Sequence, residues 1–421
     1  MLNKNNEREL AYLVRVEAIT PMNADRLECA HIGGWHCVVG KGEFKVGDPA
    51  VYFEIDSQLP DVEPFSSMEF LKSKNFKIKS QKIRGEISQG LLMPVTAFGW
   101  EIKYGQFGWE SEGYAFLGDN GDEPYAIDQQ GAVYTLEGES RFVTQRLGVT
   151  YADPGDNIRK GSAPDKYKKM SQRHPNIFKK KWARWLMKRE WGRKLMFFFF
   201  GKKRDKKNAW PSHIAAKTDV ERVQNMMWVL NDKQPYVASE KVDGSSCSIM
   251  AERGRFGKIK YYVCSRNVVF DKEDAPCFYE SNIYMEVWNK YNLQSIITTI
   301  LNDYNLPNVA LQMEVYGSGV QKRDYSTNEH KMAVFHIVSN GKKFPMDQTI
   351  EICEKYGLPH VPIINDNYIL PDTIEELQAY VESAPSKIDG KMKEGIVFYD
   401  KATGQQYFKF VSPEYLLKFH S

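Results

Sequence analysis

The sequence predicts a multidomain protein with an all-β N-terminal domain, a basic helical linker and a C-terminal α+β domain whose sheets are mostly antiparallel. The chain has 421 residues, which is more than one compact domain usually holds. Short apolar segments fill its first hundred residues, and strands mixed with helices fill its second half. Between them lies a segment rich in Lys and Arg. We place the three regions at residues 1–150, 151–211 and 212–421.

The composition, 42% hydrophobic and 26% charged, is that of a folded protein rather than a disordered one. The start lacks a signal peptide, and the longest strongly apolar run, residues 195–200, is too short to cross a bilayer. These features favour a cytoplasmic location. The cysteines show neither a CxxC pair nor a histidine cluster, so we expect reduced thiols rather than a zinc site or a disulfide framework. They are Cys29, Cys37, Cys247, Cys264, Cys277 and Cys353.

Five strand-like segments, each bounded by Gly, Pro or Asp, occupy the N-terminal region. They span residues 11–19, 26–40, 49–59, 76–85 and 90–98. Five strands in about a hundred residues suit a small OB-type barrel, whose open face commonly binds single-stranded nucleic acid. Another small all-β module would give the same pattern. Residues 99–139 are acidic and Gly-rich, which indicates an insertion of extra hairpins or a long loop.

Positive charge is concentrated between Gly155 and Trp210, where 19 Lys/Arg face 4 Asp/Glu, whereas the rest of the chain has 38 against 50. Such a segment suits a polyanion or an anionic surface. Four apolar side chains in it recur at i, i+4, i+7 and i+8 and predict one face of a helix. They are Phe178, Trp182, Trp185 and Leu186. This face would pack on a neighbouring domain, contact RNA or DNA, or lie on a membrane.

The C-terminal region combines strands with helices. Strand patterns occur at residues 236–242, 247–253, 259–266, 309–317, 332–339, 394–400 and 406–412, and helical patterns at 281–301 and 347–357. Most of these strands follow one another as hairpin-like pairs instead of alternating with helices. The arrangement therefore favours an antiparallel α+β domain over a doubly wound one.

Lys241 stands two positions before Asp243-Gly244, between two alternating segments. Asp-Gly in that setting is a strong hairpin signal, so a tight turn is one interpretation and a reactive amine is the other. Later strands add ionisable residues that a fold alone does not require: Glu314, Glu394 and Lys409. A buried carboxylate is costly unless it is compensated, and Asp243, Glu314 and Glu394 together would suit Mg²⁺. Each could instead be a surface residue or belong to a structural ion pair.

In chain order, these residues resemble the motifs of the covalent nucleotidyltransferases, the superfamily of polynucleotide ligases and RNA capping enzymes. Lys241–Gly244 matches the KxDG nucleophile motif, Ser265–Asn267 an arginine motif, and Glu314–Gly317 the third motif. Phe335 matches the aromatic residue that stacks on the purine, Glu394-Gly395 the EG motif, and Lys409 the last lysine motif.

The resemblance implies a role for each of these residues. The catalytic residues would be Lys241, Lys409 and Arg266. The ligands of Mg²⁺ or Mn²⁺ would be Asp243, Glu314 and Glu394. The ATP-binding set would be Glu240, Lys241, Arg222, Gly244, Arg266, Glu314, Phe335, Glu394 and Lys409. Arg222 would steady the leaving pyrophosphate, although a plain salt bridge is equally consistent with its position. An attacking lysine must lose its proton, so a nearby cation or desolvation should lower the pKa of Lys241 from about 10.4.

The domain order resembles that of the nick-sealing RNA ligases of the Deinococcus type, which combine an N-terminal OB domain with an ATP-grasp-like ligase core of the T4 RNA ligase 2-like kind. Residues 38–60 and 82–94 also look like that family. Only twelve residues follow Lys409, which leaves no room for the C-terminal OB domain of DNA ligases and capping enzymes. Three departures are Ser246, where the phage-type ligases have asparagine, the single lysine of residues 408–410, and a basic Trp-rich segment that is longer than a simple linker needs to be.

The family implies an ATP-dependent RNA ligase for RNA repair. Lys241 would accept AMP, pass it to an RNA 5′-phosphate, and an adjacent 3′-hydroxyl would then close the nick. The partner would be nicked RNA or an RNA-containing duplex, recognised through the 2′-hydroxyl, and the enzyme would be monomeric. Two alternatives remain: an ATP-dependent DNA ligase, and a non-catalytic RNA-binding protein with a degenerate transferase core.

Overall fold

The structure is a computed structural model of the chain. It describes residues 1–4, 8–110, 113–151, 186, 210–270, 277, 279, 281–405 and 407–420. The helix expected over residues 178–186, with its Trp-rich face, lies outside the described residues apart from Leu186, as does most of the segment expected to be a linker.

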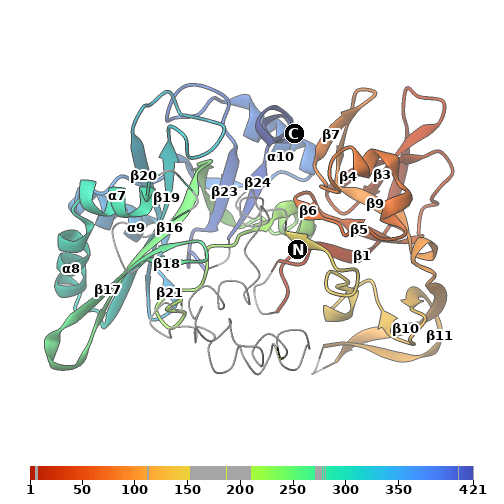
Figure 1. The fold of residues 1–421 in the computed structure, drawn as a ribbon, viewed down its shortest axis with the longest axis horizontal. Coiled ribbons are helices and arrows are strands. Elements are labelled where there is room, and N and C mark those ends of the chain that lie inside the picture. Colours follow the sequence, from red (N-terminus) through yellow and green to blue (C-terminus); the bar gives the residue numbers. More distant parts are fainter. Residues whose placement is uncertain are drawn as a thin grey trace.

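The N-terminal region folds into short antiparallel sheets that enclose an apolar core (Figure 1). Its strands are β1 (Ala11–Arg15), β2 (Ala18–Pro21), β3 (Leu27–Ile32), β4 (Trp35–Gly40), β5 (Pro49–Phe53), β6 (Ser57–Gln58), β7 (Ser80–Ile83), β8 (Glu86–Gln89), β9 (Leu91–Pro94) and β13 (Thr150–Tyr151). Short helical turns are η1 (Phe65–Ser67), α1 (Glu69–Lys72), η2 (Val95–Phe98) and η3 (Glu139–Arg141). Strand β5 is buried on both faces: Val51 and Phe53 pack into one apolar cluster, and Tyr52 into another.

The acidic stretch after this barrel forms a long hairpin of β10 (Glu101–Glu110) and β11 (Gly113–Ile127), with β12 (Val133–Tyr134) added at its edge. The expectation of extra hairpins is therefore confirmed. The hairpin lies at the outer end of the N-terminal region (Figure 1).

The C-terminal region contains two sheets. One has six strands in the order β18-β17-β16-β19-β20-β21, and the other has five in the order β14-β24-β23-β15-β22. The bounds are β14 (Glu221–Arg222), β15 (Pro235–Lys241), β16 (Ser245–Arg253), β17 (Ile259–Ser265), β18 (Val269–Phe270), β19 (Asn308–Gly317), β20 (His330–Ser339), β21 (Lys342–Lys343), β22 (Ile363–Ile369), β23 (Gly395–Asp400) and β24 (Tyr407–Val411). Every pairing is antiparallel except that of β14 with β24. The antiparallel α+β prediction is confirmed.

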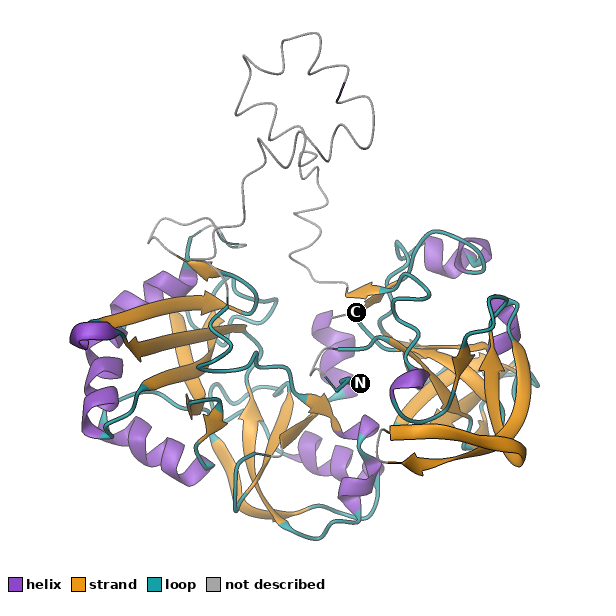
Figure 2. Ribbon diagram, turned by 90° about the horizontal axis from the view of Figure 1, so that it is seen from below, coloured by secondary structure: helices purple, strands orange, loops and turns teal. Residues whose placement is uncertain are grey.

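Helices cover the outer sides of these sheets (Figure 2). They are α7 (Ile283–Lys290), α8 (Leu293–Asp303), α9 (Met346–Lys355), α10 (Ile374–Ser383), α11 (Pro413–Tyr415) and η8 (Leu416–His420), with the short turns η5 (Val223–Asn225), η6 (Met227–Leu230) and η7 (Arg255–Gly257). The helical pattern at 281–301 is broken into α7 and α8 because Asn292 adopts a left-handed conformation with φ 48°. Helix α10 and strand β22 were not expected from the sequence.

Asp243-Gly244 does not close a hairpin, so the tight-turn interpretation is wrong. Strand β15 belongs to the five-stranded sheet and β16 to the six-stranded one, and the loop between them carries the chain across. A Cβ on Gly244 would lie 2.3 Å from the carbonyl oxygen of Val315. Glycine is needed there because the loop passes directly against the backbone of β19.

The N-terminal and C-terminal regions meet at a junction that combines hydrogen bonds with apolar contacts. Asn225 accepts a hydrogen bond from Trp35 Nε1 (2.8 Å) and donates one to the buried carboxylate of Glu54 (2.8 Å). Ile55 packs against Val411 and Leu416 in a small buried cluster. These contacts fix the barrel against the end of the five-stranded sheet that carries β24.

In the described part of the chain, no helix combines the length and the apolar character needed to cross a membrane. All six cysteines are free thiols.

Candidate active site

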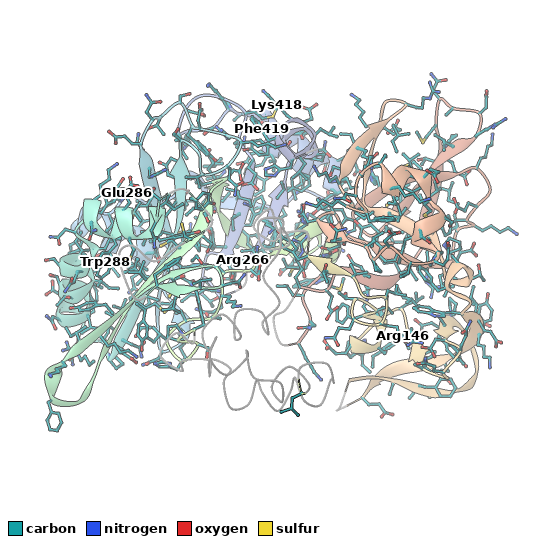
Figure 3. The ribbon with its side chains drawn as sticks, in the orientation of Figure 1. Arg146, Arg266, Glu286, Trp288, Lys418 and Phe419 are labelled. Atoms are coloured by element: carbon teal, nitrogen blue, oxygen red, sulfur yellow. The ribbon has the colours of Figure 1, made fainter. Side chains whose placement is uncertain are left out.

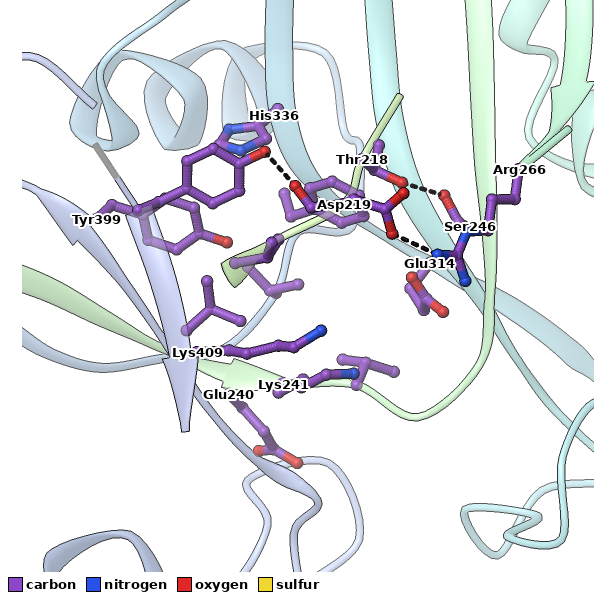
Figure 4. A pocket seen from close by; sticks show the side chains of 16 residues that line it. Thr218, Asp219, Glu240, Lys241, Ser246, Arg266, Glu314, His336, Tyr399 and Lys409 are labelled. Atoms are coloured by element: carbon purple, nitrogen blue, oxygen red, sulfur yellow. Dashed lines mark hydrogen bonds and ion pairs between the residues drawn. The ribbon is translucent and has the colours of Figure 1, made fainter. Parts of the chain in front are cut away.

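A pocket of about 160 Å³ opens between the two C-terminal sheets (Figure 4). The five-stranded sheet contributes residues of β15, β23 and β24, and the six-stranded sheet contributes residues of β16, β19 and β20. The lining consists of Thr218, Asp219, Val220, Glu240, Lys241, Val242, Ser246, Arg266, Glu314, Phe335, His336, Val361, Val397, Tyr399, Tyr407 and Lys409.

Lys241 is the last residue of β15, and its amine reaches the pocket. Its Nζ lies 2.7 Å from Glu394 Oε2, on the residue that directly precedes β23. Burial opposes the charge of Lys241, but the carboxylates of Glu394 and Glu314 outweigh it and raise its pKa. The protein residues alone do not lower this pKa, because carboxylates lie nearest to the amine. The lowering expected from a nearby cation stays a prediction.

Lys409 is the amine whose pKa is lowered. Along β24, Tyr407 and Lys409 face the pocket, whereas Phe408 and Phe410 alternate with them and enter the core. Burial first, and then the positive charges of Arg222 and Lys241, lower the pKa of Lys409 to about 7. This lysine is thus poised to take up a proton when negative charge enters the pocket.

Glu314 contributes a carboxyl group to the pocket lining. It lies on β19, opposite Ser246 in the register. Burial raises its pKa to about 8, although Lys241 opposes that rise. The positive charges of Lys241 and Arg266 attract its carboxylate, whereas Glu394 and Asp243 repel it. A cation in the pocket would relieve that cost.

Asp243 is held away from the pocket wall by the C-terminal segment. Its Oδ2 accepts a hydrogen bond from the Tyr415 hydroxyl (2.8 Å) and lies 3.3 Å from His420 Nε2. Its backbone N–H donates to the Tyr325 hydroxyl (2.6 Å). Among the described residues, no three His, Cys, Asp or Glu side chains are grouped closely enough to hold a metal ion. The ligand set of Asp243, Glu314 and Glu394 stays a prediction.

Replacing Tyr415 with phenylalanine is expected to destabilise the protein by about 1–3 kcal/mol, because a buried carboxylate loses a hydrogen-bond donor. Urea denaturation would measure this change. Tyr368→Phe, at a hydroxyl not bonded to Asp243, is the control. Equal unfolding midpoints for the two variants would show that Tyr415 does not secure Asp243.

Two arginines approach the pocket from different sides. Arg266 follows β17, lines the pocket and forms an ion pair with Asp219. Arg222 lies in β14, in register with Lys409, and stacks on Trp35 of the barrel with its Cζ 5.6 Å from the ring centre. It is buried, and its Nε and Nη1 have no hydrogen-bond partner among the described residues. Both nitrogens are enclosed by protein atoms and lie outside the pocket lining.

Aromatic rings form the end of the pocket opposite Arg266 (Figure 4). Phe335 and His336 come from β20, and Tyr399 and Tyr407 from β23 and β24. A flat ring could stack on these aromatic residues.

Glu240, just before Lys241, accepts hydrogen bonds from Ser386 Oγ (2.5 Å) and from the backbone N–H of Lys387 (2.7 Å). Burial raises the pKa of Glu240.

The structure thus brings six residues expected from the sequence to one pocket: Glu240, Lys241, Arg266, Glu314, Phe335 and Lys409. Arg222, Asp243, Gly244 and Glu394 lie next to it without lining it. Residues not foreseen are Thr218, Asp219, Ser246, His336, Tyr399, Tyr407, Tyr415 and His420. Of these residues, only Tyr407 could have been expected in the pocket, because it lies two positions before Lys409 on the same predicted strand.

Comparisons with known proteins agree with this architecture. Residues 10–95 match a family model described as an OB-fold domain, and residues 234–411 match the RNA ligase family model. No curated protein sequence matches the chain significantly.

Solved structures of Naegleria gruberi RNA ligase have the same fold along almost the whole chain. A mutant with ATP and Mn has a TM-score of 0.66 at 23% identity, covering 98% of this chain and 100% of that chain. The enzyme with PPi has a TM-score of 0.66, and a mutant with AMP and Mn has a TM-score of 0.67. Both are 23% identical to this chain, and each match covers 98% of this chain and 99% of that chain. The prediction of a barrel followed by a ligase core is confirmed. The chain is therefore similar in domain order to a protein with an OB-fold domain, matched at residues 10–95, followed by an RNA ligase domain, matched at residues 234–411.

Proposed function

We propose that the chain is an ATP-dependent RNA ligase that seals a 3′-hydroxyl to a 5′-phosphate through a covalent lysyl-AMP on Lys241. The observation that supports it most is the convergence of Lys241, Lys409, Arg266 and Glu314 on one pocket beside the aromatic Phe335. Similar structures of the Naegleria enzyme contain ATP, AMP or PPi, which fits a nucleotide in that pocket.

In the first step, Lys241 Nζ forms a bond to the α-phosphorus of ATP, and the bond to pyrophosphate breaks. The amine must first give up a proton, and the Glu394 carboxylate at 2.7 Å is the acceptor that lies in reach. Burial raises the pKa of Glu394, while Lys241 opposes that rise. A carboxylate that binds a proton readily suits this role.

The remaining groups bind and orient the nucleotide. Phe335 stacks on adenine, and Glu240 contacts the nucleotide from another part of the pocket lining. Lys409 gains a proton as the phosphates enter, and with Arg266 it stabilises the negative charge of the phosphoryl group in the transition state. Arg222, which is in register with Lys409, would steady the leaving pyrophosphate through its positive charge.

A divalent cation fits the carboxyl groups of this site. The Glu314 carboxyl group is half-buried and its pKa is raised to about 8, so a bound cation would favour its ionised form. Glu314, Glu394 and Asp243 would hold Mg²⁺ or Mn²⁺, and Asp243 would do so only by exchanging its bond with Tyr415 or His420. The metal would supply positive charge that stabilises the phosphates and favours the neutral form of the attacking amine.

The substrate would be a nick in RNA or an RNA-containing duplex, with ribose on the 3′-hydroxyl side. AMP passes from Lys241 to the 5′-phosphate, and the 3′-hydroxyl then displaces it to form the phosphodiester. We further propose that the enzyme acts as a monomer in the cytoplasm and serves RNA repair.

Incubation with α-labelled ATP and Mg²⁺ tests the proposal. We expect a labelled protein adduct in the wild type and none in Lys241→Ala, because no other residue replaces the attacking amine. Lys260→Ala, on the outer part of β17, is the matched control and should be labelled normally.

Wild-type protein without an adduct would identify a non-catalytic RNA-binding protein instead. Nicks with a ribose or a deoxyribose at the 3′-hydroxyl end separate the two ligase types. Faster sealing of the deoxyribose nick would assign a DNA ligase and contradict the RNA assignment.

A further inference from the structure

A row of lysines on the barrel carries charge that the pocket chemistry does not use. Residues 72–84 contain six Lys or Arg and no Asp or Glu. Phe76 and Ile78 are buried in the barrel core, whereas Lys77 and Lys79, which alternate with them along the chain, are only half-buried.

These charges are not neutralised by the protein. Lys72 pairs with Glu69 at 2.8 Å, but Lys74, Lys77 and Lys79 have no acidic partner in the part of the chain that the structure describes. The same holds for Lys322 and Lys418 of the ligase domain. Burial, and then the positive charges of Lys322 and Lys77, lower the pKa of Lys79. Lys322 of the ligase domain thus acts on Lys79 of the barrel, and η8, which carries Lys418, contacts β7, which begins at the residue after Lys79. We name Lys74, Lys77, Lys79, Lys322 and Lys418 the basic ridge.

The basic ridge leads from the barrel to the reaction centre. Ile78 exchanges backbone hydrogen bonds with Asp56 and Ser57 (both 2.9 Å), next to the Ile55 contact with the ligase domain. Strand β7 lies against the C-terminal segment η8, where Lys418 is exposed at the top of the junction (Figure 3). The neighbouring His420 contacts Asp243, two residues from the nucleophile.

We propose that the basic ridge binds the phosphate backbone of the RNA strand whose end enters the pocket. Lysine contacts to phosphates are independent of base sequence, and they position a strand without reading it. That suits an enzyme that must seal breaks wherever they occur. The continuity of the ridge across the junction would align both domains along one strand. The inference rests on the proposed function, because it takes a nick as the substrate.

The test uses the full chain with three variants. Lys74, Lys77 and Lys79 are changed to alanine together, Lys322 is changed alone, and a control triple of Lys41, Lys45 and Lys258 removes the same charge elsewhere. Each is assayed for lysyl-AMP formation without RNA, for affinity to a nicked RNA duplex over a range of salt, and for sealing.

We expect the basic-ridge triple to form lysyl-AMP within about twofold of the wild-type rate, which also shows that it folds. Its affinity for the nick should fall at least tenfold, and the slope of log affinity against log salt should become shallower by about two to three, since each lost phosphate contact removes about 0.7–0.9. Lys322→Ala should shift the slope by about one. The control triple should keep the wild-type affinity and the wild-type salt slope.

Wild-type affinity and salt slope in the basic-ridge triple, with normal lysyl-AMP formation, would overturn the inference and leave the proposed function intact. An absence of lysyl-AMP in the wild type would instead overturn the proposed function. Loss of binding to phosphatidylserine vesicles, with unchanged binding of nicked RNA, would assign the ridge to a membrane surface and also overturn the inference.

Discussion

Replacing Lys409 with methionine is expected to slow lysyl-AMP formation at least ~100-fold and to stabilise the folded protein. Removing one preorganised charge from a reacting phosphoryl group costs about 100- to 1000-fold in rate. The pKa of Lys409 is lowered to about 7 by burial and by Arg222 and Lys241, so the surrounding protein disfavours its charged form. Methionine has a similar length and no charge. Single-turnover labelling and urea denaturation measure the two effects.

The lowered pKa of Lys409 determines how its contribution to folding stability changes with pH. The folded-state pKa of Lys409, about 7, lies below the unfolded value of about 10.4. Between these values the unfolded chain binds the extra proton, so wild-type stability from this group rises with pH. Lys409→Met should lack that rise. Lys343→Met is the control, because burial also lowers the pKa of Lys343, to about 8, outside the pocket lining. A Lys409→Met variant that labels as fast as this control would contradict the role of Lys409.

Replacing Gly244 with alanine is expected to lower lysyl-AMP formation about 100-fold and to destabilise the fold by about 1–3 kcal/mol. The new Cβ would lie 2.3 Å from the Val315 carbonyl oxygen and 2.9 Å from Glu314 Cγ. The loop must move away from β19, and Lys241 moves with it relative to Glu314. The adduct assay and thermal denaturation measure both consequences.

Gly118→Ala is the matched control, since its Cβ would meet no atom within 4 Å. It should behave as the wild type in both assays. If Gly244→Ala were labelled at the wild-type rate, the close contact between the β15–β16 loop and β19 would not be what positions the amine.

The sequence predicted those parts of the molecule that repeat locally or match a motif. Alternation identified β16, β19 and β23, and the order of the motifs along the chain assigned Lys241, Glu314, Phe335 and Lys409 to a common site. Asp-Gly was misleading as a turn signal because local pattern cannot show that β15 and β16 join different sheets. That distinction depends on pairings with β23 and β19, which are remote in the chain.

Electrostatic detail was also beyond the sequence. Among the protein groups alone, the pKa of Lys241 is raised by Glu394 at 2.7 Å, whereas burial and the adjoining Arg222 lower the pKa of Lys409. The bond between Tyr415 and Asp243 joins residues separated by 172 positions. Contacts between residues so far apart in the sequence arise from tertiary packing, and local sequence spacing does not predict them.

The junction at Asn225 also determines how the chain would respond to being cut. Trp35 and Glu54 hydrogen-bond to this one side chain, and Ile55 packs on Val411 and Leu416. A protease acting between residues 151 and 210 would therefore leave two pieces that still adhere and co-elute. The chain is accordingly a candidate for reconstitution from separately expressed halves, whereas a lone C-terminal fragment would expose the surface that the barrel normally shields from water.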